Sequence, residues 1–402
     1  MQSYILDDLG LSDVGGSTTD GGEWFEVVYS GITSTSAHTG PWFPAYKAIS
    51  QCNMLLGNLD KMTLTETEKK WVKGQALFIR AKTYFVLVQL YSGVPLHVKE
   101  VKSEAEAAKP RASEREVYDQ IVADLEEAQT LLPSKYADNL INGKQYAINQ
   151  TCDALLSRVY LTMAGNPLNL GTEYYTKARD KSLSVINSNT YQLLDNFAHL
   201  FDLKHENSSE SIIELDFIQV DEQGTAMPCF MAPRNSTLAV NTWGTMRLRK
   251  KFVKEWRMAT CENGFNITNN GDGSTSITEI PGEEDYRYQT SLISEYTNKS
   301  GAKVTCFPKI GWQANDKHSN YAFLSKYCDP NGVSQNGHGN NVILMRFAEI
   351  YLIFAEAQNE IAGPVTEYQG LSPLAALNKL RERARKANGV QRTFPKKSKR
   401  NF

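Results

Sequence analysis

The chain has 402 residues and nearly balanced charge, with 43 basic and 45 acidic side chains and a formal net charge of −2 at pH 7. This balance gives no electrostatic reason to expect nucleic acid or an anionic membrane surface as a partner, and a neutral ligand is compatible with it. A hydrophobic fraction of 41% with 22% charged residues is ordinary for a globular protein, which argues against global disorder and fibrous repeats.

The six cysteines form no C-x-x-C pair and no zinc-like spacing, so the sequence predicts no metal and no other cofactor. Cys52 and Cys152 fall in helical patterns and are expected to be buried free thiols. A disulfide stays open among the remaining four, which are Cys229, Cys261, Cys306 and Cys328.

The N-terminus shows neither the basic nor the apolar region of a signal peptide. No apolar stretch approaches the ~20 residues that a membrane-spanning helix needs. Taken alone, these absences indicate a cytoplasmic protein, and a trimmed chain would show the same pattern.

The first strong helical signal is a capping box. Thr65 followed by Glu68 begins a long helix with apolar side chains at three- and four-residue spacings. This helix is expected to end at the Gly-Val-Pro break of residues 93–95, where glycine permits a left-handed cap. Ser113 with Glu116 repeats the capping box and begins a second helix, so the two helices form a hairpin.

Further helices are predicted on both sides of this hairpin. Upstream, residues 44–59 place their apolar side chains on one face. Downstream, Asn149 opens a helix that runs to Gly165, and Thr172 is expected to cap the next one.

A third pair is predicted near the C-terminus. Residues 342–361 read as one helix stopped by Gly363 and Pro364, and Ser372 with Pro373 at its first position begins another. Serial helical hairpins predict a mainly α-helical scaffold of the tetratricopeptide type, without a clean repeat consensus.

Between residues 206 and 341 the composition shifts to clusters of Gly, Asn, Ser and Thr, with minor β-structure. Ile213, Leu215 and Phe217 alternate with Glu214 and Asp216, as expected of a strand with one buried face. The chain is therefore predicted to be a single domain with four parts: helical hairpins at 1–205, a loop-rich ligand-facing insert at 206–341, a helical pair at 342–388 and a disordered tail at 389–402.

Motifs for nucleotide binding, zinc proteolysis and α/β-hydrolase chemistry are absent. Residues 269–274 resemble a calcium loop faintly, but Pro281 stands at the closing glutamate position, which favours a solvated turn. The adjacent Glu283, Glu284 and Asp285 favour a solvated face over a glycosidase pair.

The tryptophans suggest a ligand. Trp71 lies on a helical apolar stripe, whereas most of the others fall in polar loops, where a ring can offer a flat face to a sugar. Each loop ring could instead anchor its own loop on the helices. The residues expected to bind the ligand are Trp24, Trp42, Trp243, Tyr286, Tyr288 and Trp312.

Several segments, in the same order over most of the chain, resemble the SusD/RagB family of Bacteroidetes. They are DGGEW at 20–24, Trp42 with Tyr46 to Asn53, GQALFIRA at 74–81, GVPL at 93–96, RFAEIYLIFAEA at 346–357 and ALNKLRERA at 376–384. Within these segments Arg80, Arg346 and Glu356 are charges on otherwise apolar helices, so we expect them to form structural ion pairs.

The resemblance implies a SusD-like helical fold and non-catalytic binding of an oligosaccharide at the cell surface. It implies delivery to a SusC-like TonB-dependent transporter of the outer membrane, which would be the protein's partner. Family members carry a lipoprotein signal with a lipidated cysteine, whereas the first cysteine here, Cys52, lies in a helical pattern. They also continue past the last helix into an E-R-R-x-E-L-like segment, whereas this sequence stops at Phe402.

Two other functions stay open. A helical glycoside hydrolase or lyase would place two carboxylates along the aromatic cleft. A tetratricopeptide-type adaptor that binds peptides would show an open concave helical groove without a covering insert.

Overall fold

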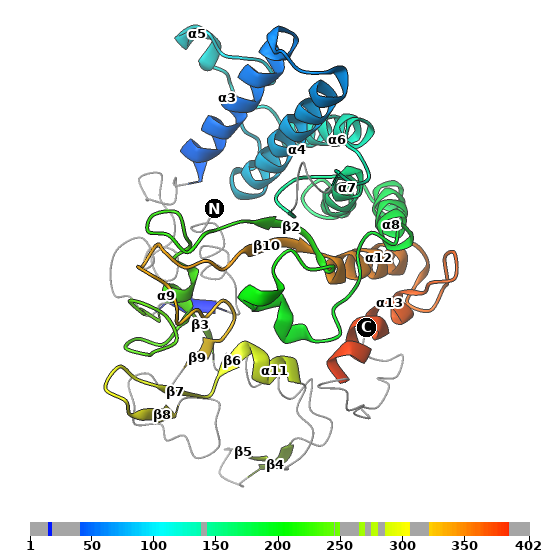
Figure 1. Cartoon of the computed structure of the whole chain (residues 1–402). Helices are drawn as coiled ribbons and strands as arrows, with labels where there is room; N and C mark the ends of the chain where they lie inside the picture. The colour runs from blue at the N-terminus through cyan, green and yellow to red at the C-terminus, as the bar shows by residue number, and fades with distance from the viewer. Residues whose placement is uncertain are drawn as a thin grey trace.

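The computed structural model describes residues 15–17, 41–137, 143–244, 246–249, 265–269, 275–279, 286–305 and 321–385. Figure 1 shows a stack of helices on one side and a loop-rich region with short strands on the other. This is a mainly α-helical, tetratricopeptide-like arrangement, as predicted. Within the described residues, no helix is both long enough and apolar enough to cross a membrane.

The stack begins with three helices: α3 (Trp42–Asn58), α4 (Glu66–Tyr91) and α6 (Glu114–Leu131). Both predicted capping boxes are confirmed, because Thr65 and Ser113 accept from the backbone N–H three residues later while that residue's glutamate bonds back. The end of α4 differs from prediction. The left-handed φ of 62° belongs to Ser92, while Gly93 is required because a Cβ there would lie 2.1 Å from the carbonyl oxygen of Ala112.

The stack continues through α7 (Asn149–Ala164), α8 (Thr172–Asn187) and α12 (Phe347–Ala362), and ends with α13 (Pro373–Arg385). Thr172 is not the cap of α8; Gly171, at φ 68°, precedes the helix, and no side-chain cap forms there. Ser372 does cap α13, since its hydroxyl accepts from the backbone N–H of Ala375 at 3.1 Å. The predicted helix at 342–361 begins five residues too early.

Residues Val342–Arg346 form strand β10, which pairs antiparallel with β2 (Ser211–Leu215). These five residues form a strand rather than an extension of α12, because β2 supplies hydrogen-bond partners for their backbone. Burial on β2 is not the expected alternation: Glu214 is buried alongside Ile213, because both faces of the ribbon are covered. This ribbon links the helical stack to the loop-rich region (Figure 1).

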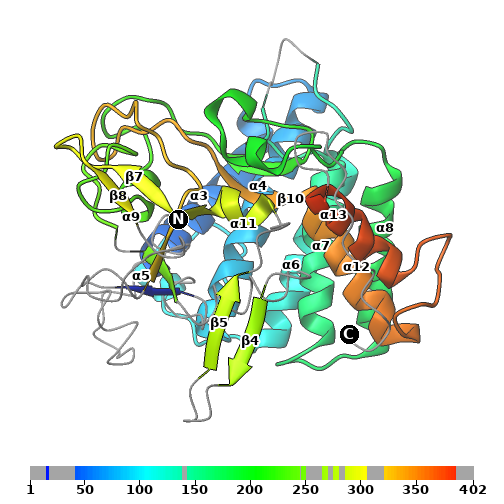
Figure 2. The ribbon, with the colours of Figure 1, turned by 90° about the horizontal axis from the view of Figure 1, so that it is seen from below.

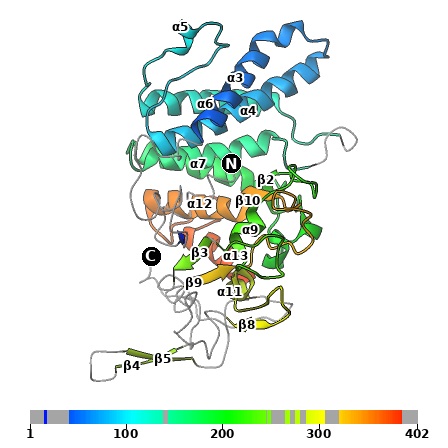
Figure 3. The ribbon, with the colours of Figure 1, turned by 90° about the vertical axis from the view of Figure 1, so that its left-hand side faces the viewer.

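The remaining elements are short. Figure 2, seen from the loop-rich side, and Figure 3 show a hairpin, β4–β5, that projects from the body away from the helices. One four-stranded sheet has the order β1-β3-β9-β6. The bounds are β1 (Gly15–Ser17), β3 (Met246–Arg249), β4 (Phe265–Asn269), β5 (Thr275–Glu279), β6 (Leu292–Ile293), β7 (Glu295–Thr297), β8 (Lys303–Thr305), β9 (Tyr321–Leu324), α5 (Glu104–Ala107), α9 (Met227–Met231), α11 (Tyr286–Ser291), η3 (Leu59–Lys61), η4 (Phe197–Phe201) and η5 (Leu203–His205).

The two largest of the four hydrophobic clusters in the described residues hold these layers. The large one joins α3, α4, α6, α7, α8 and α12 through fully buried side chains such as Tyr84, Ile121 and Phe354. The smaller one lies under the loop-rich region and includes Met227, Met246 and Leu324. The loops are therefore packed on a core of their own, which gives their exposed side chains a fixed base.

Candidate functional site

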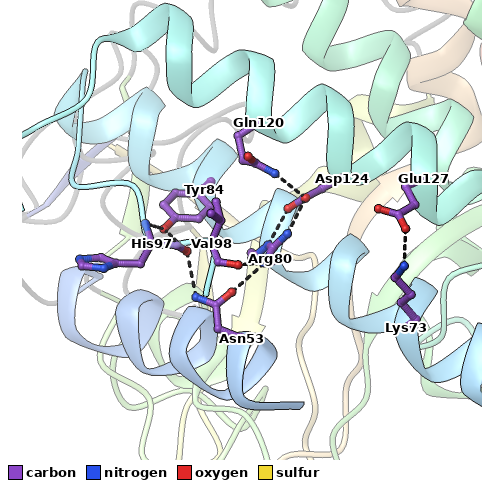
Figure 4. Close-up of polar contacts among 9 residues, drawn as sticks. All are labelled: Asn53, Lys73, Arg80, Tyr84, His97, Val98, Gln120, Asp124 and Glu127. Carbon is purple, nitrogen blue, oxygen red and sulfur yellow. Dashed lines mark hydrogen bonds and ion pairs between the residues drawn. The ribbon is translucent and has the colours of Figure 1, made fainter. Parts of the chain in front are cut away.

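The charges embedded in the helices form structural ion pairs rather than a ligand site. Arg80 on α4 donates to both carboxylate oxygens of Asp124 on α6 at 2.7 Å, and to Asn53 on α3 at 2.7 Å (Figure 4). Both charged side chains are at most 6% exposed. One arginine therefore ties three helices together, as predicted for Arg80.

Arg346 is also paired as predicted, with Glu210 at 2.9 Å, and Arg383 joins the same carboxylate from α13. The prediction is wrong for Glu356. Its side chain lies on the exposed face of α12 and makes no ion pair within the described part of the chain. An exposed carboxylate is solvated by water and needs no partner.

Among the predicted binding residues, Trp243 is the best defined. Its ring is 36% exposed and packs edge-on against Phe230 on α9, with ring centroids 4.9 Å apart. Its backbone N–H donates to the carbonyl of Cys229 at 2.8 Å. Gly244 follows at φ 58°, where a Cβ would meet Phe323 and the backbone of Arg234 at 3.0 Å. These contacts fix the backbone around Trp243, so its indole faces solvent in a fixed orientation.

The segment that carries Trp243 also carries exposed polar side chains. The segment 234–244 is tied to the β7–β8 hairpin, because the backbone N–H and the hydroxyl of Thr237 both donate to Thr297 at 3.0 Å and Lys299 N donates to Asn235 at 2.9 Å. Asn235, Thr237 and Asn241 are exposed. No sequence motif marks these three residues, and the polar composition of 206–341 is their only signal.

The other predicted binding residues are not gathered around Trp243 by any described contact. Trp42 begins α3 on the helical side, half-buried against Tyr46 at 4.9 Å and Tyr91 at 5.1 Å between ring centroids. Tyr286 and Tyr288 lie on α11, and their side chains fall outside the description. Trp24 and Trp312 lie outside the described residues altogether, as do Glu283, Glu284 and Asp285.

A cysteine, a histidine and an aspartate meet beneath the loop of Trp243. The ring of His338 lies 3.3 Å from Asp329 through Nδ1 and 3.4 Å from the Cys229 thiol through Nε2. The order of groups is that of a nucleophilic triad, but the side chains of His338 and Asp329 are 0% exposed. Burial raises the pKa of the Cys229 thiol to about 11, so it stays protonated and unreactive at neutral pH. The three residues therefore hold together the loop segments that carry them.

Carboxylates also gather around Asn341. Its side-chain N–H₂ donates to Glu214 at 3.0 Å and Asp216 at 2.9 Å, and its backbone N–H donates to Glu206 at 2.6 Å. Burial, and the neighbouring carboxylates, raise the pKa of both Glu206 and Asp216. In the portion of the chain that is described, no set of three His, Cys, Asp or Glu side chains is arranged to hold a metal ion.

The expected thiol states agree with the structure where it describes them. Cys52 and Cys152 are buried and free, as predicted, and Cys229 and Cys328 are also free thiols. Cys261 and Cys306 fall outside the described residues.

Two family models match the chain. Residues 13–161 match a model described as starch-binding, associating with the outer membrane, and residues 209–402 match that of the SusD family. A relative, SusD-like protein P2 of Formosa agariphila, is 28% identical over 358 residues, which are 87% of this chain and 63% of the relative. The chain thus spans about three fifths of the length of the curated relatives it matches.

Solved structures agree on the fold. A SusD superfamily protein from Parabacteroides distasonis has a TM-score of 0.74 at 21% identity, covering 98% of this chain and 76% of its own. A laminarin-binding SusD-like protein has a TM-score of 0.72 at 20% identity, covering 97% of this chain and 79% of its own. With the helical stack and the two family matches, these likenesses show that the chain belongs to the SusD/RagB family.

Proposed function

We propose that this protein binds oligosaccharide at the cell surface without cleaving it and delivers it to a SusC-like TonB-dependent transporter. The observation that carries the proposal is the fixed, solvent-facing indole of Trp243. A sugar ring has an apolar C–H face and hydroxyl edges, so it pairs well with an aromatic plane ringed by polar groups. Family membership and the laminarin-binding neighbour support a glycan as the ligand.

In this proposal Trp243 stacks on the sugar, and the exposed Asn235 and Asn241 of the same segment bond its hydroxyl groups. Further contacts to the ligand are proposed for Trp24, Trp42, Tyr286, Tyr288 and Trp312. Because Trp243 is held by Phe230 and by the backbone of Cys229, little side-chain entropy is lost on binding. A shallow site of this kind gives micromolar or weaker affinity.

The described groups best placed for catalysis support binding rather than hydrolysis. Glu206, Glu214 and Asp216 are engaged by Asn341 and by backbone N–H groups, and Asp329 is enclosed with His338. A glycosidase needs one carboxyl as acid and another as base or nucleophile, both facing the scissile bond. These four carboxylates instead hold loops together.

Affinity electrophoresis in gels that contain a polysaccharide tests the site. Laminarin is the first polysaccharide to try. Trp243→Ala is expected to weaken retardation, with a loss of about 1–2 kcal/mol in binding free energy. Tyr146→Ala is the matched control, because Tyr146 is an aromatic side chain that is 41% exposed and is not among the residues proposed to bind glycan. Equal retardation of the Trp243→Ala variant and the unaltered protein would show that Trp243 is not part of the binding site.

The localisation and the partner are part of the same proposal. The family description places its members at the outer membrane, and we propose that a lipid-modified N-terminus and the transporter keep the protein there. Co-purification with a SusC-like transporter in detergent is the expected result. Recovery of the tagged protein from membranes without any transporter would argue against the partnership.

A further inference from the structure

A second candidate site lies between the helical stack and the β2–β10 ribbon. It is a cavity of about 820 Å³, lined by α3, α4, α7, β2 and β10. This volume falls within the ~300–1,000 Å³ usual for small-molecule sites. It far exceeds the packing voids of a well-filled core, which are few and rarely larger than a water molecule.

The lining is mostly apolar. Two cations, Lys82 and Arg158, and two carboxylates, Glu214 and Asp216, interrupt it. Lys82 on α4 lines the cavity and has no hydrogen bond, ion pair or ring contact with any residue that the structure describes. Burial, together with the like charge of Arg158, lowers the pKa of Lys82 to about 8.

Two other lysines in the described parts, Lys144 and Lys326, have the aromatic contact that Lys82 lacks there. The pKa of Lys144 and that of Lys326 are also lowered by burial. Lys144 lies over the ring of Tyr191 at 4.8 Å, and Lys326 lies over Phe201 at 4.7 Å. Each has an aromatic face that compensates for lost water. Lys82 has no such aromatic face among the described residues.

The like charge of Arg158 cannot serve as a partner for Lys82. Arg158 on α7 also lines the cavity, and its guanidinium is paired with Glu349 of α12. That carboxylate is therefore already used. Glu214 and Asp216 belong to the cavity wall too, but they are held by Asn341. Of the four charged side chains in the wall, Lys82 is thus the one without a side-chain partner among the described residues.

We propose that this cavity binds a small organic anion with an apolar body, whose negative group is held by Lys82. The apolar body packs on lining side chains that keep exposed surface, such as Ile79 and Val86 of α4, while the carboxylate or sulfonate replaces the water that Lys82 loses. Charge complementarity selects the anion over a neutral molecule of the same shape.

Two fluorescent probes test this directly: 1-anilinonaphthalene-8-sulfonate and N-phenyl-1-naphthylamine, which lacks only the sulfonate. The unaltered full chain is expected to bind the sulfonate at least ~10-fold more tightly than the neutral probe, since a bond to a charged group contributes that much. Equal affinities, or no binding of either probe, would overturn the proposal without any variant being made.

Variants then locate the site. Lys82→Met is expected to abolish the preference for the sulfonate, and Lys82→Arg to keep it. Lys70→Met is the matched control, because Lys70 lies exposed on the same helix. Ala48→Trp, which fills the cavity from α3, is expected to weaken both probes. If Lys82→Met leaves the ratio of affinities unchanged, or Ala48→Trp changes neither probe, the anion binds elsewhere and the proposal is wrong.

Discussion

Arg80 and Asp124 form a two-pronged ion pair across the first helical hairpin, with Nε to Oδ2 and Nη2 to Oδ1 both at 2.7 Å. The remaining guanidinium nitrogen bonds Asn53 and the backbone of Val98. All three guanidinium nitrogens of Arg80 and both carboxylate oxygens of Asp124 thus take part in hydrogen bonds, which fixes the register of α4 against α6 and α3.

Removing one partner of this pair leaves a buried charge uncompensated. Arg80→Met is therefore expected to lower the free energy of unfolding by about 3–5 kcal/mol. Lys73→Met is the control: Lys73 pairs with Glu127 nearby on the same two helices (Figure 4), but both side chains are at least 40% exposed, so the loss should stay under about 1 kcal/mol. Urea denaturation measures both. Similar losses in the two variants would contradict the structural role of Arg80.

Two glycines are expected to respond in opposite directions to alanine. A Cβ on Gly93 would lie 2.1 Å from the carbonyl oxygen of Ala112, whereas one on Gly57 meets nothing closer than 4.0 Å. Gly93→Ala should destabilise the protein by about 1–3 kcal/mol through overpacking. Gly57→Ala, at an exposed position of α3, should stabilise the protein by up to about 1 kcal/mol. Thermal melting of the two variants checks the signs, and a stable Gly93→Ala variant would rule out the close approach.

The amide of Asn341 separates three carboxylates, so replacing it with a fourth is expected to be costly. Asn341→Asp loses the N–H₂ donor to Glu214 and Asp216 and should cost about 2–4 kcal/mol at pH 7.

This cost depends on pH with a definite sign. The folded protein raises the pKa of Glu206 and Asp216, so it binds more protons than the unfolded chain, and stability rises as pH falls through those values. The Asn341→Asp variant should therefore lose less stability at pH 5 than at pH 7, as followed by urea denaturation. A loss that does not change with pH would show that the introduced carboxylate does not interact with its neighbours.

The Cys229 thiol is expected to be inert in the folded protein despite its contact with His338. Its pKa is raised to about 11 by burial, and the reactive species is the thiolate. Alkylation with iodoacetamide, followed by mass spectrometry of the Cys229 peptide, should show labelling only after unfolding. Rapid labelling of the native protein at pH 7 would instead indicate a nucleophile and would revive an enzymatic interpretation.

The helical scaffold could be predicted because its signals are local. The capping boxes at Thr65 and Ser113 lie within single turns, and both are confirmed. Residues 342–346 were assigned wrongly to a helix because their state depends on pairing with β2, more than a hundred residues away along the chain. Burial of Glu214 has the same origin, since its partner Asn341 comes from that distant segment.

The candidate site was less accessible to sequence reasoning. Trp243 was named from composition, but its fixed orientation arises from Phe230 and Gly244, which no motif marks. The meeting of Cys229, His338 and Asp329 has no characteristic spacing, because loop packing alone brings them together. The sequence holds no signal for Lys82, because a lysine on a helix that lacks a partner among the described residues looks the same in sequence as one that is solvated.

The central claim is that the protein binds glycan and does not cleave it, and isothermal titration calorimetry with an intact oligosaccharide tests both halves at once. We expect heats that saturate with added laminarin oligosaccharide and return to baseline after each injection. The Trp243→Ala variant should show weaker binding under the same conditions. Heat that continues after each injection, as substrate is turned over, would contradict the account, as would the absence of any binding heat across a panel of oligosaccharides.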